Sequence, residues 1–139
     1  SRGLGDVYKR QTLQSAQRIA LNNGYDSFLM FNVYAQRATR PDDMERVCNS
    51  ALHEENRKAF RYLLSLSESP AIWAAWGNII EKRDYLMDCM RDFAADGQAA
   101  NAQWFTAGPL LKSGHPHHPL YLKSTTALQP FDIDAYLCR

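Results

Sequence analysis

The amino-acid sequence predicts an α/β fold: a three-layer sandwich with helices on both faces of a short, mostly parallel sheet. Three apolar runs, at residues 27–34, 71–76 and 102–106, have the length of buried strands, and each is followed by polar or Gly- and Pro-containing sequence. The stretches between them show helical periodicity and are long enough for the right-handed crossovers that join parallel strands. At 139 residues, with 45% hydrophobic and 22% charged residues, the chain fits one domain with a real core.

Helices are expected at residues 12–23, 43–48, 54–66 and 78–96. In the three longer ones apolar residues recur every three or four positions, which places them on one face. Asn23-Gly24 and Gly97 are expected to end the first and last of these helices.

Residues 1–11 are set aside as a non-native tail. They show no periodicity, and residues 6–11 (Asp-Val-Tyr-Lys-Arg-Gln) look like the translation of a sequencing adapter at the end of a metagenomic gene fragment. We therefore expect residues 12–139 to form a single domain that is incomplete at its N-terminus. A native flexible N-terminus is the alternative.

Charge and cysteine content narrow the class of protein. The net charge of +1 gives no general signature of a nucleic-acid binder, although it leaves room for a local basic patch. Cys48, Cys89 and Cys138 are odd in number and form no C-x-x-C pair, which favours reduced thiols in a cytoplasmic protein over disulfides or a structural zinc site. No apolar run approaches the roughly 20 residues of a membrane span, so we expect no membrane partner.

The stretch from Gly114 to Leu122, called here the histidine loop, is the most unusual feature of the sequence. It holds three histidines, interleaved with prolines that fix the backbone: His115, His117 and His118. Imidazole donates and accepts protons near neutral pH. The alternative is a rigid surface turn whose histidines face water. No metal is expected, because the histidines lack a helical i, i+4 pair and no acidic residue or cysteine lies nearby.

Other polar candidates also follow the expected strands, at the edge of the sheet where open α/β folds bind ligands. The candidate ligand-binding residues are Asn32, Arg37, Thr39, Trp76, Gly77, Asn78, Lys112 and Tyr121. Three of them have a structural alternative: Asn32 as a core amide, Arg37 as a solvated cation and Trp76 as a core aromatic ring. The chain lacks G-x-G-x-x-G and G-x-x-x-x-G-K-[ST] motifs, so no cofactor is expected.

Four segments carry a resemblance to a known family: Asn32-Val-Tyr-Ala-Gln-Arg-Ala-Thr-Arg-Pro41, Asn56, Ala75-Trp76-Gly77, and Gly114-His-Pro-His-His-Pro-Leu-Tyr121. On these, residues 12–131 resemble the bacterial and phage family of domain-of-unknown-function proteins numbered 1643. Arg40 stands where that family usually has an aspartate. The family's opening strand, which ends in Asn-Pro-Ser-like residues, is absent.

The family pattern in turn looks like the uracil-DNA glycosylase superfamily. That resemblance implies a glycosylase-like sheet without its first strand, and a nucleobase, nucleotide or DNA as partner. It aligns His118 with the imidazole that stabilises charge on the departing base, and Asn32 with the amide that reads the base. A non-catalytic nucleotide or nucleic-acid binding module and a protein-interaction domain are the alternatives. The sequence does not fix the oligomeric state.

Overall fold

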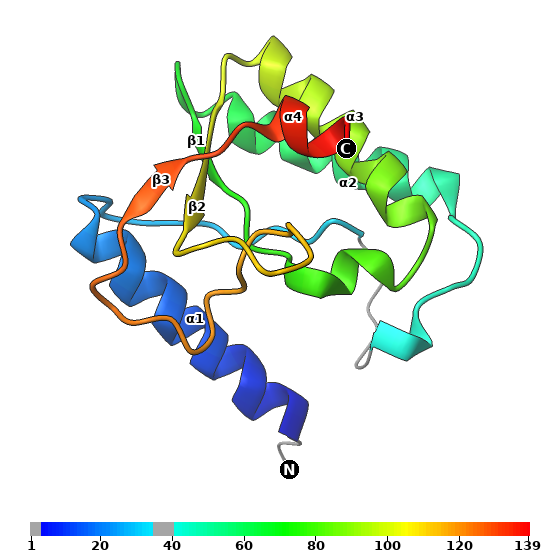
Figure 1. Ribbon diagram of the computed structural model, residues 1–139. Helices are drawn as coiled ribbons and strands as arrows, with labels where there is room; N and C mark the ends of the chain where they lie inside the picture. The colour runs from blue at the N-terminus through cyan, green and yellow to red at the C-terminus, as the bar shows by residue number, and fades with distance from the viewer. Residues whose placement is uncertain (1–3, 35–40) are drawn as a thin grey trace.

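The computed structural model describes residues 4–34 and 41–139, and within them it has four α-helices, two 3-10 helices and three strands (Figure 1). In chain order these are α1 (Leu4–Asn22), η1 (Pro41–Asp43), α2 (Ser50–Leu64), β1 (Ala71–Trp73), η2 (Gly77–Glu81), α3 (Tyr85–Ala99), β2 (Gln103–Ala107), β3 (Leu128–Pro130) and α4 (Ile133–Leu137). Figure 1 shows α2 and α3 packed side by side, whereas α1 lies away from this pair.

The described strands form one small mixed sheet in the order β1-β2-β3. β1 runs parallel to β2, with Ile72 opposite Trp104, and β2 runs antiparallel to β3, with Phe105 opposite Pro130. The α/β class and the parallel pairing of the second and third expected strands are therefore confirmed. The sheet is smaller than expected, and its third strand is one that the sequence did not indicate.

The prediction of a strand at residues 27–34 is wrong. This segment is extended, but it joins no sheet in the described part of the chain. Helices bury its apolar side chains instead: the Phe31 ring lies 5.0 Å from Phe60 and 5.6 Å from Phe93. The Asn56 side chain on α2 then fixes the backbone by donating to the Asn32 carbonyl at 3.0 Å.

The longer helices lie near their expected positions but have different ends. α1 begins at Leu4, inside the segment set aside as foreign, and its helical conformation does not test where that segment comes from. α2 begins at Ser50 because the Asn49 side chain caps it, accepting from the Leu52 N–H at 3.1 Å. The short helix expected at 43–48 is absent. Between residue 41 and the start of α2, the structure has only the 3-10 helix η1.

The helix expected at 78–96 is divided into η2 and α3 and does not end at Gly97. Gly97 lies inside α3, where a Cβ would approach the Trp104 indole nitrogen to 3.2 Å. This glycine allows the helix to pack closely on β2, so it is a packing residue rather than a stop signal. β1 is also shorter than its apolar run, although the Ala74 N–H still donates to the Phe105 carbonyl at 2.8 Å.

Candidate functional site

The histidine loop packs directly on the turn that follows β1. The Gly77 N–H donates to the Pro116 carbonyl at 3.0 Å, and a Cβ on Gly77 would lie 3.6 Å from the Cβ of His118. Gly77 has φ +62°, a left-handed conformation that side-chain-bearing residues rarely adopt. Glycine therefore allows the turn, while the space beside it would admit a Cβ in ordinary van der Waals contact with the loop.

His115 is the structural histidine of the loop. It is 3% exposed, and its Nδ1 lies 2.7 Å from the Tyr136 hydroxyl and 3.0 Å from Nη2 of Arg139. Because a guanidinium only donates, Nδ1 accepts and the proton is on Nε2, which faces the Glu81 carboxylate at 3.5 Å. These contacts hold His115 inside the fold.

His117 and His118 are half-buried and differ in which ring nitrogen carries the proton. His117 donates from Nδ1 to the His118 carbonyl at 2.7 Å. The Leu120 N–H donates to Nδ1 of His118 at 3.2 Å, which leaves the proton of a neutral His118 on Nε2. Burial, and to a smaller degree the neighbouring His117, lower the pKa of His118 below its usual value. His118 is therefore a neutral imidazole at pH 7.

Trp76 is linked to the histidine loop through Tyr136, whose hydroxyl contacts both Trp76 and His115. Tyr136 lies on α4, and the sequence analysis missed it. The Trp76 indole N–H donates to the Tyr136 hydroxyl at 3.0 Å, and its ring packs edge-on against Trp104. Burial raises the pKa of Tyr136. Trp76 thus makes the core contacts that were the alternative to ring stacking. Its contact with α4 could not be read from local sequence, although Asp132 is a recognisable N-cap.

The other sequence-predicted residues are placed as follows. Asn78 is exposed and its side-chain oxygen accepts from the Ser113 hydroxyl at 2.5 Å. Lys112 is exposed, and Tyr121 is 89% exposed. Asn32 is exposed too, and no described contact joins its side chain to the histidine loop. Arg37 and Thr39 lie outside the described residues.

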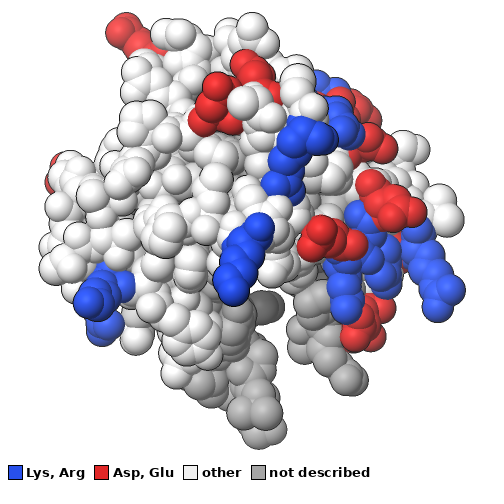
Figure 2. Space-filling model, viewed as in Figure 1, with Lys and Arg blue, Asp and Glu red and all other residues white. Residues whose placement is uncertain are grey.

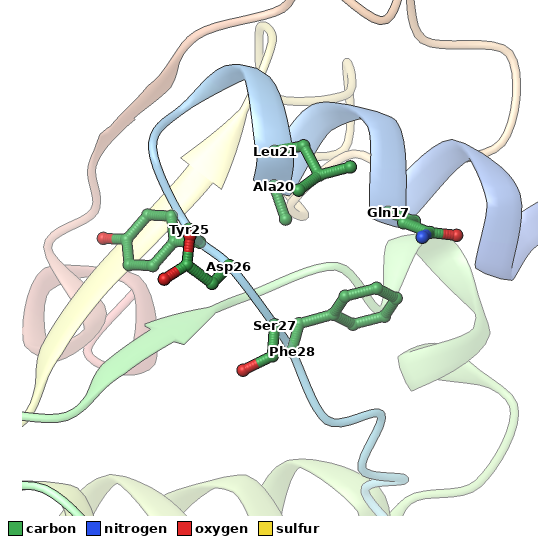
Figure 3. A pocket seen from close by; sticks show the side chains of 7 residues that line it. All are labelled: Gln17, Ala20, Leu21, Tyr25, Asp26, Ser27 and Phe28. Atoms are coloured by element: carbon green, nitrogen blue, oxygen red, sulfur yellow. The ribbon is translucent and has the colours of Figure 1, made fainter.

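Two surface hollows accompany the loop and α1. The first, of about 240 Å³, lies between the end of α1 and the segment after it (Figure 3), and none of the candidate residues lines it. The second, of about 360 Å³, lies between α1 and residues 120–123, and Tyr121 forms part of its wall. The candidate site therefore continues from the histidine loop into the second hollow.

The described residues give no metal cluster, and the face drawn in Figure 2 is not uniformly basic. Among residues 4–34 and 41–139, no group of three or more His, Cys, Asp or Glu side chains could hold a metal ion. On the face in Figure 2, Lys and Arg side chains are mixed with Asp and Glu at the right, and much of the rest is uncharged. No helix in the described part of the chain is long and apolar enough to cross a membrane.

A second polar cluster, which the sequence analysis missed, joins α2 to α3. Nε2 of His53 lies 2.8 Å from a carboxylate oxygen of Asp92, and Arg57 binds Asp96 through two hydrogen bonds of 3.0 and 2.8 Å. Both pairs use an i, i+4 spacing on each helix, which is a signal that the sequence does contain. Nδ1 of His53 is buried and bonds to no described residue. The cluster is built into the helix interface and does not open on the histidine loop.

Comparison with protein families gives one match: the family model described as "Protein of unknown function (DUF1643)" covers residues 5–120. Its range includes the Gly77 turn and the histidine loop as far as Leu120. Neither the curated proteins nor the solved structures gave a match.

Proposed function

Since the chain belongs to the DUF1643 family, whose description assigns no activity, we propose that it recognises a nucleobase or nucleotide at the histidine loop. His118 is the group that contacts the base. The hydrogen bond from the Leu120 N–H to Nδ1 of His118 carries this proposal, because it orients the ring and sets the proton of the neutral imidazole on Nε2.

A neutral donor suits a base better than a cation would. The keto oxygens of nucleobases accept hydrogen bonds, and a neutral imidazole donates one without bringing a charge into a half-buried site. The lowered pKa of His118 keeps it neutral at pH 7. The rigid Gly77 turn beneath His118 supports a fixed position for the donor, which selective recognition requires.

The same donor supports a catalytic version of the proposal. If the N-glycosidic bond breaks, negative charge develops on the base oxygens, and a fixed donor stabilises that charge more than it stabilises the intact nucleotide. Glycosylase-style base release is therefore the enzymatic form of this function. A module that binds the base without chemistry is the other form.

The test titrates the protein with a panel of free bases and nucleosides and follows the His118 ring nitrogens by NMR. His118→Ala should abolish binding, whereas His117→Ala should bind like wild type, because the His117 Nδ1–H donates to a backbone carbonyl of the loop itself. His118→Gln, which keeps an N–H donor, should retain part of the affinity. Equal losses from His117→Ala and His118→Ala would refute the assignment. Release of free base from damaged oligonucleotides separates the enzyme from the binding module.

A further inference from the structure

The groove between α1 and residues 120–123 is the second candidate binding feature of the molecule, beside His118. It has a volume of about 360 Å³ and is lined by the last residues of the histidine loop, among them Leu120, which donates its N–H to His118. One wall is the polar face of α1, with Gln11, Gln14 and Arg18. The opposite wall includes Tyr121 and Lys123.

Tyr121 has a strained backbone conformation that is not stabilised by packing of its side chain in the core. Its backbone has φ +72°, in the left-handed region, which costs an L-residue about 1–2 kcal/mol. Its side chain is 89% exposed, so no core packing offsets that cost. A glycine would satisfy this turn more easily, and an exposed aromatic ring in its place is what a stacking ligand requires.

The charged residues that line the groove are all basic. Arg18 and Lys123 contribute two cations, and none of the residues that line the groove is acidic. Neither cation forms an ion pair with a described residue. The amides of Gln11 and Gln14 add neutral donors and acceptors. An exposed ring in a groove with two cations that pair with no described residue matches a ligand that alternates flat bases with phosphates.

We infer that this groove binds single-stranded nucleic acid, with a base stacked on Tyr121 and backbone phosphates at Arg18 and Lys123. An open groove cannot enclose a lone nucleotide, whereas a strand gains affinity from several weak contacts in series. A duplex hides its base faces and leaves Tyr121 nothing to stack on. The inference rests on the proposed function in sharing its ligand class, and it assigns the strand to residues other than His118.

The experiment measures fluorescence anisotropy of a labelled 15-nucleotide oligo-dT strand with the full chain. Tyr121→Gly should weaken binding about tenfold by removing the stacked ring. The same change removes the strain at φ +72°, so the thermal midpoint should stay level or rise. Tyr121→Phe keeps the ring and should bind like wild type. Because the thermal midpoint does not fall when the affinity is lost, misfolding cannot explain the result.

Charge and control variants complete the test. Arg18→Gln and Lys123→Gln should each lower the slope of log affinity against log salt by about 0.7, the value for one lost phosphate contact. Tyr62→Ala and Lys58→Gln, at exposed positions on α2, are the matched controls and should change neither affinity nor slope. Wild-type affinity in Tyr121→Gly, equal binding of duplex and single strand, or full competition by free dTMP would overturn the inference.

Failure of the groove and failure of the base site are distinguishable. His118→Ala should lose base binding yet hold oligo-dT within about twofold, because Tyr121, Arg18 and Lys123 are unchanged. Loss of strand binding in His118→Ala, with wild-type binding in Tyr121→Gly, would assign the strand to His118 instead.

Discussion

The histidine loop and the α2–α3 interface each enclose an imidazole, but they are built for different purposes. At the interface, His53 faces a carboxylate of Asp92, and the adjacent Arg57–Asp96 pair is held by two hydrogen bonds. In the loop, the ring nitrogen of His118 is held by a backbone N–H, and burial lowers the pKa. An imidazole beside a carboxylate serves as a fixed connector, whereas one that accepts from a backbone N–H has its tautomer set without a charged neighbour.

The largest effect is expected at the interface. Asp96 has a side chain only 7% exposed, so Asp96→Ala removes two hydrogen bonds from the partly buried Arg57 guanidinium, which among the described residues keeps only the exposed Glu54 at 3.6 Å, and should cost about 3 kcal/mol in the free energy of unfolding. Urea denaturation measures this. Asp88→Ala, which removes an exposed pair with Arg91 on the same helix, should cost less than about 0.5 kcal/mol. Similar costs for the two variants would show that the interface pair contributes no more than a surface pair.

The next effect separates backbone strain from loop packing. Gly77→Ala and Gly24→Ala both place a methyl group at positive φ and should each cost about 1–2 kcal/mol. The strained residue Gly77 is also bonded to the histidine loop through the Pro116 carbonyl, and a Cβ there would be in ordinary van der Waals contact with His118, whereas a Cβ at Gly24 meets nothing within 4 Å. Only Gly77→Ala should therefore weaken ligand binding at the loop as well. Identical binding by both variants would separate the Gly77 turn from the site.

A smaller effect concerns pH. The folded-state pKa of His118 lies below the unfolded value of about 6.5, so the unfolded chain takes up this proton first as the pH falls. Stability should be level above pH 6.5 and decrease as the pH falls from there toward the folded pKa. His118→Gln should show a shallower decrease between pH 7.5 and 5.5 in thermal unfolding. An unchanged pH profile would mean that burial does not suppress the charge on His118.

The smallest effect concerns the reactivity of two thiols. Cys89 reports on the exposure of the α2–α3 interface, and Cys138 reports on the exposed end of α4. Burial raises the pKa of Cys89 on α3 to about 12, so its thiolate is scarce and shielded at pH 8, while Cys138 after α4 is exposed. A thiol reagent should label Cys138 rapidly and Cys89 only after unfolding, followed by mass spectrometry. Rapid labelling of Cys89 in the native protein would indicate that the α2–α3 interface opens readily.

Local patterns in the sequence predicted much of this fold. Periodic apolar residues located α1, α2 and α3, and short apolar runs located β1 and β2, because these signals depend on neighbours in the chain. The strand predicted at 27–34 was wrong because an apolar run indicates that a segment is buried, but does not indicate whether a sheet or helices cover it. β3 and α4 are short, and contacts with residues far along the chain stabilise them.

The candidate site was predictable in part for the same reason. The rule that ligand residues follow strand ends brought Gly77 and the histidine loop into one group, and the structure places them in contact. It could not show that Trp76 and His115 are joined through Tyr136, since that residue lies on α4. Nor could it separate the three histidines, whose roles depend on the partner of each ring nitrogen.

In the extended segment 27–34, the protection of backbone amides from exchange and the packing of side chains should differ, although they usually agree. None of its amide N–H groups donates to a described residue, yet Phe31 lies against Phe60 and Phe93 in the core. Amide hydrogens without partners exchange with solvent quickly even where the chain is fixed. In a hydrogen-exchange map this segment should therefore resemble an unfolded loop, while the methyl and ring signals of its side chains are as well dispersed as those of the helices beneath it.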